Sequence, residues 1–199
     1  MNQPTMTTDE RVKQYMNFMP EMLTESTIIS KLGEASFFEV PASIKYHGAY
    51  TGGLFDHSFA VASALVSLTQ RLELKWLRPE SPYIVGMFHD LCKTELYGIT
   101  MIENHSGIFA DGKEIGNTFN KEWIRRENSL MPDHGALSII LAQQLVSLTK
   151  EEIACIRWHM GTFEKDTSLW SYYGTAIETY PNVLYSHTAD MIASRIIGV

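Results

Sequence analysis

Gly-Met-Phe-His-Asp-Leu-Cys-Lys, residues 86–93, is the most informative segment of this chain. The imidazole of His89 and the carboxylate of Asp90 stand side by side within an almost wholly apolar run, residues 83–92. A run that is apolar on all sides predicts a buried helix. A carboxylate there is costly unless something pairs with it, and a divalent metal ion binds carboxylate and neutral imidazole together. The alternative is a core histidine hydrogen-bonded to its neighbour, and the other histidines bear on that choice.

The size and charge of the chain limit the classes of function. Its 199 residues suit one domain, and a hydrophobic content of 45% is ample for a core. The formal net charge of −7 argues against a long basic groove, so we expect no tight binding of duplex DNA. A phosphorylated substrate stays compatible with this charge, because a metal site supplies its own positive charge.

The cysteines and the lengths of the apolar runs indicate the cellular compartment of the protein. Cys92 and Cys155 both lie in apolar segments and neither belongs to a CxxC pair, which argues against disulfide and thiolate–zinc frameworks. Buried reduced thiols fit a reducing cytoplasm. The first residues carry no signal-peptide apolar stretch, and no run approaches the ~18 apolar residues of a membrane span. We therefore expect a cytoplasmic protein with no membrane partner.

Hydrophobic periodicity predicts an all-α chain, in which residues 1–199 form a single domain. N-terminal helices are expected over residues 9–32 and would pack on the rest of the domain. A cap at Thr8 or Asp9, a break at Pro20 and a stop at Gly33 bound those helices. The further helices are expected over residues 54–72, 83–92, 134–148 and 150–160, and from Pro181 onward. Residues 162–180 are mixed and aromatic, and we assign no element to them.

The residue pattern of the chain changes between residues 97 and 131. Glycines recur there, and Asp111-Gly112 is a tight-turn signal. This pattern predicts an irregular insertion, with a short β-hairpin as one form of it. Such an insertion is a candidate lid over a substrate, and the alternative is a plain surface excursion.

Several polar residues of this chain lie within, or at the start of, the apolar faces of expected helices. They lie on five expected helices, and they are His57, His89, Asp90, His134, His159 and Asp190. One such residue is usually structural, but six, all His or Asp, are hard to satisfy without metal. Four imidazoles and two carboxylates match a site for two ions, in which one carboxylate bridges because it has two oxygens.

The order of these residues resembles the HD-domain metal-dependent phosphohydrolase superfamily. The segments that carry the resemblance are Gly52-Gly53-Leu54-Phe55-Asp56-His57-Ser58, His89-Asp90-Leu91-Cys92-Lys93, Asp133-His134-Gly135, Trp158-His159-Met160-Gly161 and Asp190. The first segment is similar to the start of the HD domain of bacterial 3′–5′ exoribonucleases, although the chain has no room for their nucleic-acid-binding OB domain. The Gly-Tyr-Pro motif of the cyclic-dinucleotide branch is absent. The resemblance implies an HD-type helical bundle over about residues 45–195.

The resemblance also implies a ligand set and a chemistry. His57, His89, Asp90 and Asp190 would hold one metal, and Asp90, His134 and His159 a second, with Asp90 bridging and central to catalysis. The ions would be divalent Mn, Fe, Ni, Co or Zn, and a metal-activated water would cleave a phosphoester. Lys93 would neutralise phosphate charge, or alternatively be a snorkelling or exposed lysine after the helix end. His47 is a candidate substrate contact and His187 a candidate outer-shell residue, with packing roles as the alternative for both.

Three functions remain in competition at this point. The first is hydrolysis of a small phosphorylated substrate, such as a nucleotide or a short oligonucleotide. The second is a mixed-valent di-iron oxygenase, since imidazole plus carboxylate suits iron and manganese alike. The third is a regulatory or binding domain with a structural metal, which the full ligand set disfavours. Metal analysis with an oxygen-uptake assay separates the first two.

Overall fold

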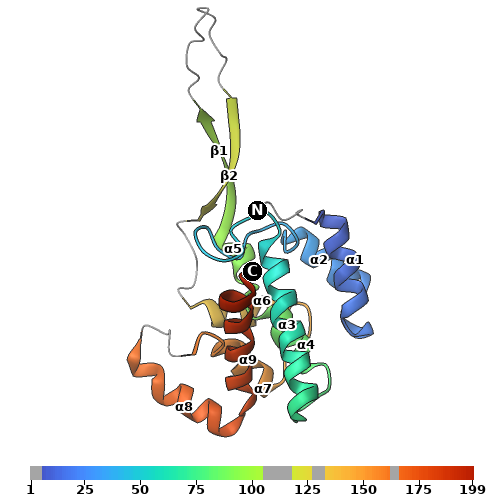
Figure 1. Cartoon of the computed structure of the whole chain (residues 1–199), viewed down its shortest axis with the longest axis vertical. Helices are drawn as coiled ribbons and strands as arrows, with labels where there is room; N and C mark the ends of the chain where they lie inside the picture. Colours follow the sequence, from blue (N-terminus) through green and yellow to red (C-terminus); the bar gives the residue numbers. More distant parts are fainter. Residues whose placement is uncertain (1–5, 105–117, 127–132, 162–165) are drawn as a thin grey trace, which may run out of the picture.

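The computed structural model describes residues 6–104, 118–126, 133–161 and 166–199 (Figure 1). The chain is mostly helical, with a two-stranded antiparallel sheet. The α-helices are α1 (Thr8–Phe18), α2 (Ser26–Glu34), α3 (Gly53–Leu72), α4 (Ser81–Phe88), α5 (Lys93–Leu96), α6 (His134–Gln143), α7 (Lys150–Arg157), α8 (Trp170–Thr179) and α9 (Asn182–Met191). Shorter helical turns are η1 (Glu21–Leu23), η3 (Thr167–Leu169) and the π-helical η4 (Ile192–Ile197). None of the described helices has the length and apolar character needed to cross a membrane.

Helix α3 is the central element, with α1, α4 and α9 packed around it (Figure 1). One face of α3 joins a core built with the N-terminal helices and α4, to which Leu54 and Phe55 contribute. The other face joins a second core with α7 and α9, to which Val61 and Leu65 contribute. The expected apolar stripe of this helix is therefore buried on two sides, and the helix places His57 in the interior.

The hairpin expected in the insertion is present and projects away from the helices (Figure 1). Strands β1 (Tyr97–Asn104) and β2 (Thr118–Arg125) pair antiparallel, with Tyr97 opposite Arg125 and Ile99 opposite Trp123. The β-branched and aromatic residues of both segments favour this pairing. The Asp111-Gly112 turn signal lies outside the described residues.

Side-chain caps mark the starts of several helices. Thr149 caps α7 and forms a capping box with Glu152, and Asp133 caps α6 by accepting a hydrogen bond from the main chain of Ala136 at 2.8 Å. The last helix follows Pro181 as expected. The first helix is capped by Thr7 rather than by Thr8 or Asp9, because Thr7 is the residue that makes a capping box with Glu10.

The expected helix over residues 21–32 is wrong in both bounds. The chain makes the single turn η1, in which Thr24 donates both its main-chain N–H and its hydroxyl to the carbonyl of Glu21, and α2 begins only at Ser26. Gly33 does not stop the helix. Ser36 takes the left-handed conformation instead, at φ 57°, and the N–H of Phe37 then bonds to the carbonyl of Leu32 at 2.9 Å. Burial of Phe37 holds this helix end.

Three other helix assignments need correction. The apolar run 83–92 is not one helix, because α4 ends at Phe88 and tight turns carry the chain through residues 89–92 into α5. Helix α6 ends at Gln143 rather than near residue 148, and the Nζ of Lys31 donates to the carbonyl of Gln144 at 2.8 Å. Residues 170–179, to which no element is assigned from the sequence, form α8. Their aromatic residues obscure the helical periodicity of the segment.

Candidate metal centre

His57 lies in the first turns of α3 and is fully buried. Its Nδ1 lies 2.9 Å from the main-chain oxygen of Val199, so Nδ1 carries the proton and donates it. Its Nε2 therefore presents a lone pair on the other side of the ring. That nitrogen lies 3.2 Å from the Nε2 of His89 and 3.2 Å from the Oδ1 of Asp190, which comes from α9.

His89 and Asp90 follow the C-terminal end of α4. The Nδ1 of His89 donates to the carbonyl of Gly86 at 2.9 Å, three residues earlier, which turns Nε2 toward His57. The Oδ2 of Asp90 lies 3.9 Å from that Nε2. One ligand atom from each of His57, His89 and Asp90 lies within 4.8 Å of the others, so this buried group could hold a metal ion.

His159 repeats the arrangement of His89 at the end of α7. Its Nδ1 donates to the carbonyl of Ile156 at 2.8 Å, again three residues earlier. Its Nε2 lies 3.6 Å from the Oδ1 of Asp90, too far for a good hydrogen bond. That nitrogen is buried and has no hydrogen-bond partner among the residues that the structure describes.

The charge distribution suits a cation. Three buried Nε2 lone pairs and two carboxylates face one another, and the main-chain bonds at Nδ1 keep the protons on the outer side of each ring. Two imidazole lone pairs at 3.2 Å repel each other unless a positive charge lies between them. Main-chain acceptors of this kind orient metal-bound histidines in general. The donor set therefore fits a metal ion held by imidazole and carboxylate.

The pKa shifts of these groups have the same origin. Burial lowers the pKa of His89 to about 4, against the opposing effect of Asp90, so His89 is neutral near pH 7. Burial also disfavours the charged form of His57, but in that form Nε2–H would donate to Asp190, and this bond together with the nearby carboxylates outweighs burial and raises the pKa of His57. His159 follows the same pattern, where burial is outweighed by Asp90 and its pKa rises. The carboxylates thus attract positive charge into the group.

His134 is the first residue of α6 and is half-buried. The head of α6 lies close to α7, because a Cβ on Gly135 would come within 2.5 Å of the carbonyl oxygen of Arg157. Burial, and then the charge of Lys93, lower the pKa of His134, and Asp90 and His159 also act on it. His134 thus belongs to the electrostatic surroundings of Asp90, although the group of closely spaced ligand atoms described above does not include it.

Lys93 opens α5 and is half-buried beside Asp90, with its Nζ 4.0 Å from the Oδ1. Its ammonium also lies 5.9 Å from the centroid of the Tyr97 ring. Burial opposes the charge on this lysine, but Asp90 outweighs burial and raises its pKa, so the side chain is cationic. The side chain of Lys93 is 13% exposed, so it is not a fully exposed lysine, whereas a snorkelling lysine stays compatible with the structure.

The remaining predicted residues lie around this centre. His47 stacks on His57, with ring centroids 4.9 Å apart. His187 donates from Nδ1 to the main-chain oxygen of His159 at 2.7 Å, which is an indirect contact with the centre through a ligand's backbone.

Sequence reasoning missed the main-chain acceptors of the three buried imidazoles. Gly86 and Ile156 each precede a histidine by three residues at a helix end, where carbonyl groups lack helical partners. That spacing is a usable signal once the helix ends are known. Val199 is 142 residues from His57, and no local pattern connects the two.

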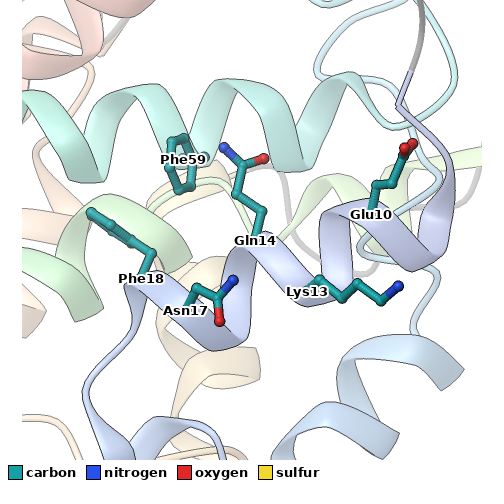
Figure 2. Close-up of a pocket in the computed structure, with 6 residues that line it drawn as sticks. All are labelled: Glu10, Lys13, Gln14, Asn17, Phe18 and Phe59. Carbon is teal, nitrogen blue, oxygen red and sulfur yellow. The ribbon is translucent and has the colours of Figure 1, made fainter.

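A pocket lies between α1 and α3 (Figure 2). Six side chains line it, from Glu10, Lys13, Gln14, Asn17, Phe18 and Phe59. None of them is a predicted ligand, and Phe59 comes from a different face of α3 than His57. The residues that line this pocket therefore have no part in the metal chemistry proposed below.

Comparisons of the chain with models of protein families, with curated proteins and with solved structures find no match.

Proposed function

We propose that this protein is a phosphohydrolase of the HD-domain type that cleaves a phosphoester bond in a nucleotide or another small phosphorylated molecule. The observation that carries the proposal is the set of lone pairs facing one another at His57, His89, His159, Asp90 and Asp190. Such a set is poorly satisfied by protein groups alone and is well satisfied by divalent ions. His134 would complete it.

The residues would divide between two ions, with His57, His89 and Asp190 on one side of Asp90 and His159 and His134 on the other. The ions, when bound, would supply Lewis acidity toward a phosphoryl oxygen and lower the pKa of a water. The protein's part is to hold the imidazoles in one tautomer through their Nδ1–H bonds, and to keep Asp90 available to both sides. Burial of the three imidazoles keeps bulk water from competing for their lone pairs.

Lys93 supports an anionic substrate such as a phosphate ester. Its ammonium is held beside Asp90 and is partly exposed, so it would pair with a phosphoryl oxygen. The deciding experiment measures bound metal, then phosphate release from a panel of nucleotides and phosphodiesters beside oxygen uptake. Oxygen consumption without phosphate release would contradict the proposal.

Substitution of His159 should separate the two ions. We expect His159→Gln to lower bound metal from two ions per chain to one, since Asp90 would keep its contacts with His57 and His89. Elemental analysis of purified protein checks the stoichiometry. His187→Gln is the matched comparison, because it removes the hydrogen bond from Nδ1 to the main chain of His159 and touches no proposed ligand side chain. Loss of both ions from His159→Gln would show that the sites are not separable.

Substrate size follows from the charge of the surface. With a net charge of −7, affinity for phosphate should come from the ions and Lys93, so only a few phosphates would be held. We expect faster turnover of mononucleotides or small phosphodiesters than of long RNA or DNA. The salt dependence of KM should be shallow, since few counterions are released. Rapid degradation of long single strands, with binding that falls steeply between low and moderate salt, would contradict this expectation.

A further inference from the structure

The residues of the centre differ in exposure. His57, His89 and His159 have at most 1% of their surface exposed. Lys93, His134 and Asp190 are partly exposed, so they are residues of the centre that solvent reaches. His47 is half-buried as well, and its ring lies against that of His57 at an interplanar angle of 39°.

The loop that carries His47 is held by its own hydrogen bonds. The hydroxyl of Ser43 donates to the carbonyl of His47 at 3.0 Å and accepts from the N–H of Tyr46 at 2.7 Å. The N–H of Ala42 donates to the carbonyl of Gly48 at 3.0 Å. Ser43 and Ala42 are buried, so these bonds are shielded from water. The backbone at His47 is a defined turn.

Two glycines allow this turn to pack closely against the start of α3. Gly48 has a φ of +60°, a conformation that favours glycine. A Cβ on Gly53 would lie 2.0 Å from the carbonyl oxygen of Gly48, so any larger residue at 53 would displace the turn. Gly53 begins the helix that carries His57 one turn later. The position of His47 relative to His57 is therefore set by direct main-chain contact.

The imidazole of His47 is available to a ligand. No group in the described part of the chain is hydrogen-bonded to its ring nitrogens, in contrast to His57, His89 and His159. Four groups of the centre act electrostatically on this ring besides its burial, namely His57, Asp190, Asp90 and Lys93. An imidazole offers an N–H donor in either protonation state. The ring thus offers a hydrogen-bond donor beside the proposed metal ligands, and it is itself partly exposed.

We infer that His47 is a substrate-binding residue, which donates a hydrogen bond to a phosphoryl oxygen of the molecule held at the centre. The inference rests on the proposed function, because it needs a phosphate at the ions. His47 and Lys93 would then contact the same phosphoryl group from two segments, the 42–48 turn and the start of α5. A contact of this kind holds substrate and transition state alike, so it should affect binding more than turnover.

The test uses the manganese-loaded protein with His47→Leu and His47→Gln. Leucine keeps an apolar side chain against the His57 ring without a donor, whereas glutamine restores an N–H. Calorimetric titration with inorganic phosphate should give a Kd about tenfold higher for His47→Leu, as expected for one hydrogen bond to a charged group. His47→Gln should recover most of that loss. With a chromogenic phosphodiester, KM should rise in His47→Leu while kcat stays within about twofold. Metal content and Tm should match the wild type.

Three results would overturn the inference. Phosphate binding by His47→Leu equal to the wild type would show that His47 makes no contact with substrate. Loss of metal from His47→Leu would make it a ligand instead. If His47→Gln does not restore the phosphate affinity that His47→Leu loses, the role of His47 is packing alone. Failure of the manganese-loaded wild type to bind phosphate or cleave the diester is a different result, because it removes the proposed function and the inference with it.

Discussion

Asp90→Asn will abolish the proposed hydrolysis and the stabilisation of the protein by metal. Asp90 is the carboxylate that lies within 4.0 Å of His89, His159 and Lys93 together, and it is the ligand proposed to serve both ions. An amide is a far weaker metal ligand than a carboxylate. We expect turnover to fall by about a thousandfold, in line with the share of catalysis that metal ions supply.

The stability readout isolates metal binding from general damage. At a free metal concentration of a hundred times Kd, one ion stabilises the folded state by about 2.7 kcal/mol. For a chain of this size that is a Tm rise of about 5–10 °C on adding metal to chelator-treated protein. Wild type should show the rise and Asp90→Asn should not, as measured by thermal unfolding with and without Mn²⁺.

Asp56→Asn is the matched control. Asp56 directly precedes His57 but binds the guanidinium of buried Arg11, with contacts of 2.9 and 3.0 Å, and the hydroxyl of Tyr50. Breaking this ion pair should lower the free energy of unfolding by about 3 kcal/mol, with or without metal. The rise in Tm on adding metal should persist. An equal metal content in Asp90→Asn and wild type would contradict the bridging role of Asp90.

The sequence predicts three residues that the structure brings together as a possible metal-binding group, but it does not predict their geometry. Residue type and apolar context single out His57 and the His89-Asp90 pair, which the structure brings together in the interior. Residue type and apolar context identify these residues because burying a polar group costs free energy, so a polar residue in an apolar segment indicates a specific role. The apolar pattern does not report where a helix ends, since turns can be buried as well. His89 was consequently assigned to a helix interior, whereas it follows the last residue of α4.

The position after a helix end is what makes the ligand geometry possible. Inside a helix, the carbonyl three residues before His89 or His159 would lie in the regular ladder of hydrogen bonds. At the end of α4 and of α7 that carbonyl accepts from Nδ1 and sets the ring. The contacts between His57 and Asp190 or Val199 arise from the packing of α9 and η4 on α3, over more than a hundred residues of sequence. Such contacts depend on the whole core.

Gly86→Ala should damage both stability and the centre, although the residue ligates nothing. A Cβ at this position would lie 2.3 Å from the Cα and 2.6 Å from the main-chain nitrogen of Ala62, on α3. Both atoms are backbone, so relief requires α4 to move away from α3. Overpacking of this kind costs about 1–3 kcal/mol, against which alanine gains about 1 kcal/mol in helix propensity. We expect a net loss of about 1 kcal/mol in the free energy of unfolding, measured by urea denaturation.

The effect on function should be larger than the effect on stability. His89 and Asp90 follow α4 directly, and the carbonyl of Gly86 accepts the Nδ1–H of His89, so a shift of this helix displaces two ligands together. A displacement of about 1 Å in a reacting group lowers a rate by about a hundredfold. We expect Gly86→Ala to lower turnover by this amount and to weaken metal binding, both measured at a temperature where the variant is folded.

Gly174→Ala provides the comparison within the same chain. Gly174 lies in α8, and a Cβ there would meet nothing within 4 Å. This variant should be more stable than wild type by up to about 1 kcal/mol, because glycine disfavours helix. Its metal content and turnover should not change. If Gly86→Ala also gained stability and kept its metal, the close contact between α3 and α4 would not be what holds His89 and Asp90 in place.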